Sequence, residues 1–126
     1  MLVVDDNETN LRVATAALKK LGFTTVEARD GREAVERVAT TRFVLVLMDW
    51  QMPEMDGLEA TRRIRADERA HGRAPLPILG VSANTFDSDR AACLEAGMDG
   101  FLPKPITRKA LAAAIAAVCP ELLPAG

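Results

Sequence analysis

The sequence is poor in aromatic side chains and in clustered positive charge. Tyrosine is absent, and one tryptophan and four phenylalanines are present among 126 residues. Proteins that stack the bases of single-stranded nucleic acids depend on such side chains, so that kind of binding is not expected. The net charge is −2, and no block of basic residues occurs. The electrostatic signature of a nucleic-acid-binding domain is therefore missing as well.

Cysteine and histidine are also scarce. Cys93 and Cys119 lack the spacing of metal ligands, and we expect reduced, at least partly buried thiols. The single histidine, His71, lies in an arginine-rich stretch and is expected to be a solvated side chain rather than a catalytic group.

Long apolar runs are missing too. No run approaches the length of a membrane span, and no secretory signal precedes the first apolar segment, so we expect a cytoplasmic domain that does not insert into a membrane. The first apolar run begins at Leu2 without a polar lead-in, which indicates a domain excised from a longer chain.

What the chain does contain is a regular alternation of short apolar runs with helical patterns. The runs predict strands at 2–4, 24–28, 44–48, 78–81 and 100–102. Apolar residues at helical spacing predict helices from a cap at Asn7 or Thr9 to Gly22, and over 32–40, 57–65, 87–96 and 107–118. The polar stretch Ala66–Pro77 is expected to be a loop. Five strand–helix repeats predict an α/β fold, a doubly wound parallel sheet with helices on both faces.

Polar side chains follow the predicted strands at the point where each strand ends. Asp49 follows the uninterrupted apolar run 44–48, which is typical of a strand buried on both faces. The other residues placed in this way are Asp5, Asp6, Ser82 and Lys104. The carboxyl ends of parallel strands lie at one edge of a sheet, where ligands of such folds bind. We therefore expect these side chains to converge.

Three carboxylates so close together need a compensating charge. Two of them about 4 Å apart repel by about 4 kcal/mol at an effective dielectric constant near 20. Either one stays protonated or a cation binds, and an all-oxygen site suits Mg²⁺ rather than zinc. A metal, a lysine and a hydroxyl are the set that phosphoryl transfer requires, and an aspartate can be the nucleophile.

The same residues resemble the receiver domains of two-component response regulators. The motifs that carry the resemblance are VVDDN at 3–7, MDWQMPEMDG at 48–57, VSAN at 81–84 and AGMDGFLPKP at 96–105. The resemblance implies a flavodoxin-like, CheY-like three-layer sandwich with five helices around a sheet of strand order 2-1-3-4-5. It assigns residues 1–119 to the receiver domain and 120–126 to a short C-terminal tail.

The resemblance also implies roles for individual residues. Asp49 would be the phosphoacceptor. Asp6 and Asp49 would ligate Mg²⁺ directly, Asp5 partly through water, and the backbone carbonyl of Gln51 would complete the protein ligands. Mn²⁺ is a second candidate metal. The side chains of Ser82 and Lys104 would hold the phosphoryl oxygens. A cis Lys104-Pro105 peptide would aim the lysine inward.

A conformational switch and a partner are implied as well. Ser82 would move toward the phosphoryl group and Phe101 would change rotamer behind it, although Phe101 equally fits a core residue of an edge strand. Gln51 and Asn84 would tune the lifetime of the phosphoryl group.

The motif wording most resembles receivers of hybrid sensor kinases and phosphorelays, so the expected partner is a histidine kinase or a histidine phosphotransfer domain. Candidate contacts are Asn10, Leu11 and Ala14, of which the last two also fit the core stripe of their helix. Trp50 either shapes docking or is partly buried under a neighbouring loop. The oligomeric state is left open.

Three other functions are alternatives for these residues. A haloacid-dehalogenase-type phosphatase also uses an aspartate after a strand, but it needs a second aspartate where Gln51 stands. A flavin- or nucleotide-binding domain needs a glycine-rich loop where Asp5-Asp6-Asn7 stands. A receiver that serves only as a docking module is disfavoured because all five expected polar positions are filled. We do not expect a conventional enzyme in the isolated domain.

Overall fold

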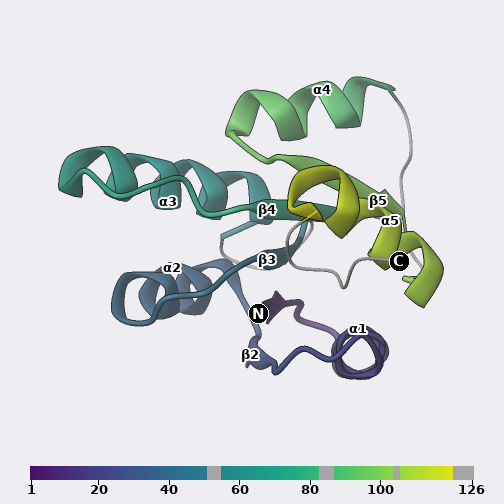
Figure 1. Cartoon of the computed structure of the whole chain (residues 1–126). Coiled ribbons are helices and arrows are strands. Elements are labelled where there is room, and N and C mark those ends of the chain that lie inside the picture. Colours follow the sequence, from purple (N-terminus) through teal and green to yellow (C-terminus); the bar gives the residue numbers. More distant parts are fainter. Residues whose placement is uncertain (51–54, 83–86, 104–105, 121–126) are drawn as a thin grey trace.

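The computed structural model describes residues 1–50, 55–82, 87–103 and 106–120, and for residues 87–90 and 93 only the backbone. Strands and helices alternate through the described chain (Figure 1). The strands are β1 (Leu2–Val4), β2 (Val26–Ala28), β3 (Val46–Asp49), β4 (Ile78–Ser82) and β5 (Gly100–Pro103). The helices are α1 (Glu8–Lys20), α2 (Gly31–Thr40), α3 (Gly57–His71), α4 (Asp87–Ala96) and α5 (Arg108–Val118).

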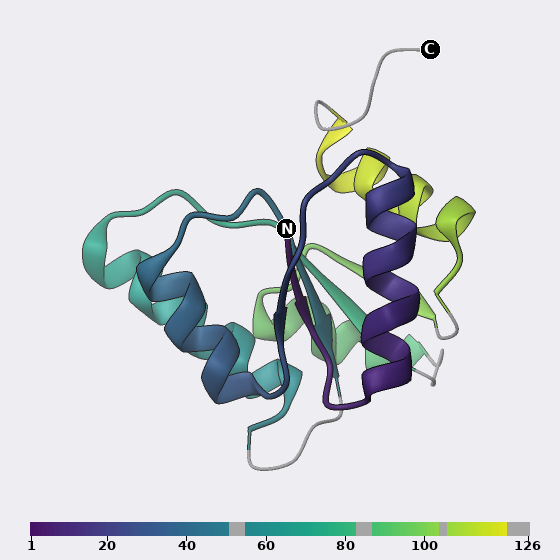
Figure 2. The same cartoon turned by 90° about the horizontal axis from the view of Figure 1, so that it is seen from below.

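The strands form one parallel sheet in the order β2-β1-β3-β4-β5. Helices cover both of its faces: α1 and α5 lie together on one side, and α2 and α3 lie on the other (Figure 2). The helix α4 packs next to α3 and β5. This is the doubly wound, three-layer architecture with strand order 2-1-3-4-5, and the predicted fold is confirmed.

Alternate residues of the inner strands enter two separate cores. One core joins Val3, Leu47 and Leu79 to the inward sides of α1 and α5. The other joins Val4, Met48 and further strand residues to α2 and α3. Because both faces of β1, β3 and β4 are covered, their side chains read as unbroken apolar runs, which is why these strands stand out in the sequence.

Four of the helices begin at a side-chain cap, and the one at Asn7 was predicted. Asn7, Asp30, Asp56 and Thr107 cap α1, α2, α3 and α5, each accepting a hydrogen bond from the backbone nitrogen three residues on. Such caps satisfy backbone donors that the helix itself leaves unpaired. Gly97 follows α4 with φ of 108°, as expected of a C-terminal cap.

Several predicted boundaries were wrong. The helix α3 continues to His71 and ends at the left-handed Gly72, so the first half of the expected loop Ala66–Pro77 is helical. No glycine or proline interrupts residues 66–71, and two of their acidic side chains pair with neighbours along the helix, Glu68 with Arg65 and Asp67 with His71. His71 therefore lies in the last turn of α3, exposed, with Nδ1 2.9 Å from the carbonyl oxygen of Asp67.

Four smaller corrections concern individual residues. Val44 is 50% exposed and β3 begins at Val46. The edge strand β2 begins at Val26 rather than Thr24. The pair Asp30-Gly31 is typical of a turn in the sequence, but in the structure it forms the cap and first residue of α2. On α4, the sequence favours the inner side of the helix for Ala91 and Leu94, but Leu94 is 63% exposed and Ala91 is exposed too.

The cysteines and the helices bear on two further expectations. Cys119 is buried, which fits the predicted buried thiol, whereas the side chain of Cys93 lies outside the described set. Among the helices in the described ranges, none combines the length and the apolar composition that crossing a bilayer demands.

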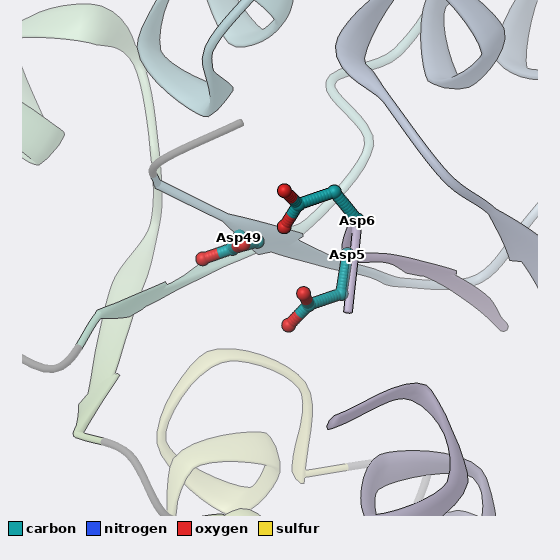
Figure 3. A group of neighbouring side chains, drawn as sticks. All are labelled: Asp5, Asp6 and Asp49. Carbon is teal, nitrogen blue, oxygen red and sulfur yellow. The ribbon is translucent and has the colours of Figure 1, made fainter. Parts of the chain in front are cut away.

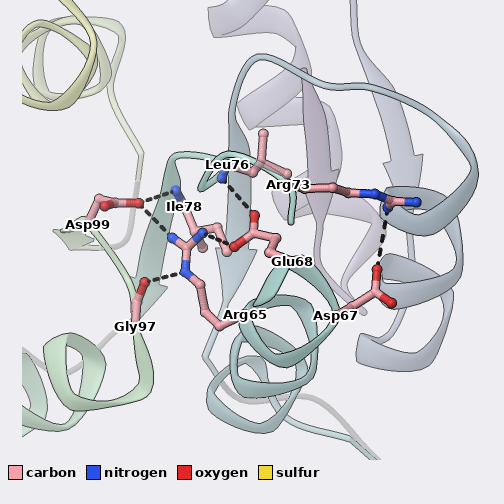
Figure 4. A network of polar contacts seen from close by, with 8 residues as sticks. All are labelled: Arg65, Asp67, Glu68, Arg73, Leu76, Ile78, Gly97 and Asp99. Atoms are coloured by element: carbon pink, nitrogen blue, oxygen red, sulfur yellow. Dashed lines mark hydrogen bonds and ion pairs between the residues drawn. The ribbon is translucent and has the colours of Figure 1, made fainter. Parts of the chain in front are cut away.

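A partly buried ionic network joins α3 to the α4–β5 turn at the amino ends of the strands (Figure 4). The Arg65 side chain, 12% exposed, donates to the carbonyl of Gly97 and to the carboxylates of Glu68 and Asp99, each at 2.9 Å. Glu68 also accepts from the Leu76 nitrogen at 2.7 Å and Asp99 from the Ile78 nitrogen at 2.8 Å. The backbone at the start of β4 is thereby held by Glu68 from α3 and by Asp99 from the α4–β5 turn.

Candidate metal and phosphoryl site

Three carboxylates meet at the carboxyl edge of the sheet. Asp5 and Asp6 follow β1, and Asp49 is the last residue of β3. One carboxylate oxygen from each lies within 4.8 Å of the other two. Figure 3 shows the side chains extending to the same side of the two strand ends. The predicted convergence of these three acids is therefore seen in the structure.

The register of the strands explains this convergence. Val4 is paired with Met48 across the β1–β3 ladder, which brings Asp5 level with Asp49. The main chain of Asp5 donates to the Ala28 carbonyl at 3.1 Å, and its carboxylate accepts from the Asn7 nitrogen at 2.9 Å. These bonds hold the turn out of β1 in place.

The three acids differ in their contact with solvent. Asp49 and Asp5 are 2% and 5% exposed, whereas Asp6 is exposed. Two unit charges 4.8 Å apart repel by about 3 kcal/mol at an effective dielectric constant near 20. The donor set is oxygen only and open to water on one side, which suits a hard divalent cation such as Mg²⁺.

The backbone around Asp49 is held tightly. Asp49 is paired with Val81 of β4, and the next nitrogen, that of Trp50, donates to the Val81 carbonyl at 2.9 Å. The Trp50 carbonyl in turn accepts from the Gly57 nitrogen at 3.0 Å. The segment that leaves β3 is thereby pinned both to β4 and to the start of α3.

Trp50 is partly buried and packs against the core that lies beneath α2 and α3. This agrees with the predicted partial burial. Its indole nitrogen is buried and has no hydrogen-bond partner within the described part of the molecule. Trp50 is also the only tryptophan in the sequence, and its position next to Asp49 makes it a natural fluorescent reporter of the site.

Ser82 lies at the same edge, at the end of β4, and is 3% exposed. The β4–β5 ladder pairs it with Pro103, the residue that precedes Lys104. Phe101 on β5 is partly buried against the α2–α3 core, which fits its interpretation as a core residue. Four predicted residues lie outside the described ranges, and their assigned roles stay predictions: Gln51, Asn84, Lys104 and Pro105.

The predicted partner contacts on α1 require a correction. Leu11 and Ala14 are 0% and 1% exposed and belong to the α1–α5 core. Neither can contact a partner in the folded domain, so the core interpretation of their helical spacing holds. Asn10 is partly exposed and remains a candidate.

Sequence patterns missed an ion pair at the rim of the site. Glu8, the first residue of α1, pairs with Arg29, which directly follows β2. The hydrogen bond and the charge of Arg29 hold the pKa of the Glu8 carboxyl below its ordinary value. The residues are 21 positions apart, and no motif or periodicity links them.

The comparison with protein families gives a match over nearly the whole chain. The model described as "Response regulator receiver domain" matches residues 1–116. Among curated proteins, the sensor protein GacS of Pseudomonas syringae pv. syringae is 41% identical over 89% of the chain, which corresponds to 12% of GacS. Histidine kinase 3 of Arabidopsis thaliana is 40% identical over 88% of the chain and 12% of that kinase. The chain thus spans about an eighth of the length of these relatives.

Two solved structures are especially informative. The receiver domain of the sensor histidine kinase PA1611 from Pseudomonas aeruginosa PAO1 has a TM-score of 0.82 and 38% identity, with 93% of each chain covered, and holds a magnesium ion in its active site cleft. The second is a co-crystal structure of the Saccharomyces cerevisiae histidine phosphotransfer protein Ypd1 and the receiver domain of its downstream response regulator Ssk1. It matches this chain with a TM-score of 0.88 and 29% identity. That match covers 97% of this chain and 90% of the other.

Proposed function

Since the chain belongs to the response regulator receiver domain family of two-component and phosphorelay systems, we propose that it accepts a phosphoryl group from a phosphohistidine onto the carboxylate of Asp49. One observation carries the proposal. Asp49 is a buried carboxylate at the end of a central strand, with oxygens of Asp5 and Asp6 within 4.8 Å. A nucleophile in such a place is rigidly aimed and open at one side only.

The reaction is an exchange of one bond to phosphorus for another. A carboxylate oxygen of Asp49 attacks the phosphorus of a phosphohistidine, and the P–N bond breaks as the P–O bond forms. The imidazole leaves with the electron pair and is protonated by solvent. Later attack by water on the aspartyl phosphate restores the carboxylate and releases inorganic phosphate.

The three acids are the groups that would hold Mg²⁺, with Asp6 and Asp49 as direct ligands, Asp5 acting partly through water and the Gln51 carbonyl as the remaining protein ligand. When bound, the ion offsets the charge of the acids and of the phosphoryl oxygens. Mn²⁺ suits the same oxygen donors. The magnesium ion in the PA1611 receiver supports this assignment.

Ser82 and Lys104 complete the proposed site. The Ser82 hydroxyl would donate to a phosphoryl oxygen from the end of β4, and the Lys104 ammonium would pair with another. A cis Lys104-Pro105 peptide would aim the lysine inward. Movement of Ser82 toward the phosphoryl group, followed by a rotamer change of Phe101, would transmit the modification, while Gln51 and Asn84 would set its lifetime.

The proposed phosphodonor is a histidine kinase or a histidine phosphotransfer domain. The relatives GacS and histidine kinase 3 support a place within a hybrid sensor kinase, on the cytoplasmic side of the membrane. The Ssk1–Ypd1 complex supports a histidine phosphotransfer domain as partner. Asn10 and the region of Trp50 are the candidate contacts on this chain.

The function is tested with Mg²⁺ and a small acyl phosphate donor such as acetyl phosphate, followed by intact-mass analysis. We expect one added phosphoryl group in the chain without any substitution and none in Asp49→Asn. Asp67→Asn is the matched control, because Asp67 lies near the far end of α3 and is not one of the clustered acids. An adduct that persists in Asp49→Asn would refute the assignment, and steady turnover of a phosphate ester would favour a phosphatase.

A further inference from the structure

Two glycines bring backbone segments unusually close together beside Asp49. A Cβ atom built on Gly31, the first residue of α2, would lie 2.5 Å from the backbone oxygen of Met55. A Cβ atom built on Gly57, the first residue of α3, would lie 2.1 Å from the backbone oxygen of Asp49. Neither distance is tolerated between non-bonded atoms, so a side chain at either position would force the backbone to move.

Close approach, rather than backbone conformation, accounts for both glycines. Among the described residues, the glycines with positive φ are Gly22, Gly72 and Gly97. Gly31 and Gly57 are not among them, and another residue could adopt their backbone angles. Both are buried, and it is the absence of a side chain that lets the two helix starts lie against their neighbours.

The contacts form a continuous chain from α2 to the proposed nucleophile. Gly31 lies against Met55, Met55 leads through Asp56 to Gly57, and Gly57 lies against the Asp49 carbonyl. Gly57 also donates to the Trp50 carbonyl at 3.0 Å. The closest contact at each glycine is to a backbone oxygen, so no flexible side chain is available to absorb a displacement.

The helix starts at both ends of this chain are themselves fixed. Asp30 caps α2 and Asp56 caps α3, each accepting from a backbone nitrogen at 2.8 Å. A methyl group at position 31 would therefore strain the contact with the Met55 backbone rather than find free space. Two residues further on, Gly57 is itself in close contact with the Asp49 carbonyl, so a displacement of the 55–57 segment bears directly on Asp49.

We propose that Gly31 is a positioning residue for the phosphoryl site: it lets α2 hold the 55–57 segment, and through it Asp49, in the geometry that binds the metal and attacks phosphorus. The proposal rests on the function proposed for Asp49. According to this proposal, α2 controls the placement of the nucleophile although it contributes no side chain to the site.

The test compares Gly31→Ala with Gly72→Ala. Gly72 has φ of 63° and no atom within 4 Å of a built Cβ, so alanine there strains the backbone at the far end of α3 without touching the site. The two variants and the unmodified chain are compared by thermal unfolding, by Mg²⁺ titration followed through Trp50 fluorescence, and by the rate of modification with acetyl phosphate.

We expect Gly31→Ala to weaken Mg²⁺ binding or slow modification by about tenfold or more, as small misplacements of reacting groups do. Gly72→Ala should stay within about twofold of the unmodified chain while losing stability, since alanine in a left-handed conformation is strained. Altered Trp50 fluorescence of Gly31→Ala without metal would locate the displacement at the site.

Equal Mg²⁺ affinity and equal modification rates in Gly31→Ala and Gly72→Ala would overturn the proposal. A Gly31→Ala chain that remains unfolded even in a stabilising osmolyte would overturn it as well, because the glycine would then serve the fold as a whole. Failure of the chain without any substitution to bind Mg²⁺ or to be phosphorylated is a separate outcome, and it would contradict the proposed function instead.

Discussion

The backbone nitrogen of Trp50 donates a 2.9 Å hydrogen bond to the carbonyl oxygen of Val81, so β3 and β4 stay paired one residue beyond Asp49. Ser82, the residue after Val81, is thereby held at the same edge as the carboxylate and is almost completely buried. The strand pairing therefore places Ser82 at the same edge of the sheet as the proposed nucleophile.

Removal of this hydroxyl should affect phosphoryl transfer more than metal binding. In Ser82→Ala we expect modification by acetyl phosphate to slow by about tenfold or more, because a preformed donor to the developing charge is lost. Mg²⁺ affinity should change little. The measurement is the modification rate from intact mass, beside a Mg²⁺ titration of the same sample. Ser82→Thr keeps the hydroxyl and should restore most of the rate; equal rates in all three chains would remove Ser82 from the mechanism.

The acid cluster predicts opposite effects of one substitution with and without metal. Without Mg²⁺, Asp6→Asn should raise the free energy of unfolding by roughly 1 kcal/mol, because one like charge is removed from a partly solvated cluster. With Mg²⁺, the stabilisation given by the ion should fall, since affinity drops by about tenfold or more when a ligand is lost. Urea unfolding in EDTA and in Mg²⁺ measures both effects. Asp67→Asn, near the far end of α3 and outside the acid cluster, should show neither effect. An Asp6→Asn chain stabilised by Mg²⁺ as strongly as the unsubstituted one would exclude Asp6 as a ligand.

The Arg65 network should be worth far more than the exposed ion pairs on the same helix. Arg65→Ala leaves two carboxylates without their cation, one of them on Glu68, whose side chain is only 9% exposed. We expect a loss of about 3 kcal/mol in the free energy of unfolding. Arg63→Ala removes a pair with Glu59 in which both side chains are largely exposed, and it should cost about 0.5 kcal/mol or less. Similar losses in the two variants would contradict a structural role for the network.

The Glu8–Arg29 pair predicts a pH dependence of stability. Arg29 lowers the pKa of Glu8 in the folded chain, so the contribution is fully present above the ordinary pKa of the carboxyl. It is lost as the pH falls through the lower, folded-state pKa. The difference in melting temperature between the unmodified chain and Arg29→Gln should therefore be positive at pH 7 and shrink in acid. A difference that is constant from neutral to acidic pH would show that the pair does not act through this charge.

The fold was predictable because the inner strands are covered on both faces. The apolar runs that end at Val4, Met48 and Val81 mark β1, β3 and β4, and the polar residues directly after them mark the site edge. Local signals were equally direct at Asn7 and Gly97, which cap helices as expected.

Features that depend on distant partners were not predictable. Glu68 is a charged residue in a polar stretch, and its burial is explained by its bonds to Arg65 and to the Leu76 nitrogen beyond the end of α3. Gly31 is a second example, because only the close approach of the Met55 backbone oxygen explains why this position has no room for a side chain. For Leu11 the helical spacing already indicated a core position, whereas the resemblance to receiver domains suggested a contact with a partner.

Chemical mapping of the modified residue tests the central claim most directly. The Mg²⁺-dependent adduct is formed with acetyl phosphate, reduced with borohydride, which converts an acyl phosphate on aspartate to homoserine, and digested for peptide mass analysis. Homoserine at position 49 alone is the result expected if the buried carboxylate at the end of β3 is the phosphoacceptor. Homoserine at position 5 or 6, or none at any of the three, would contradict it.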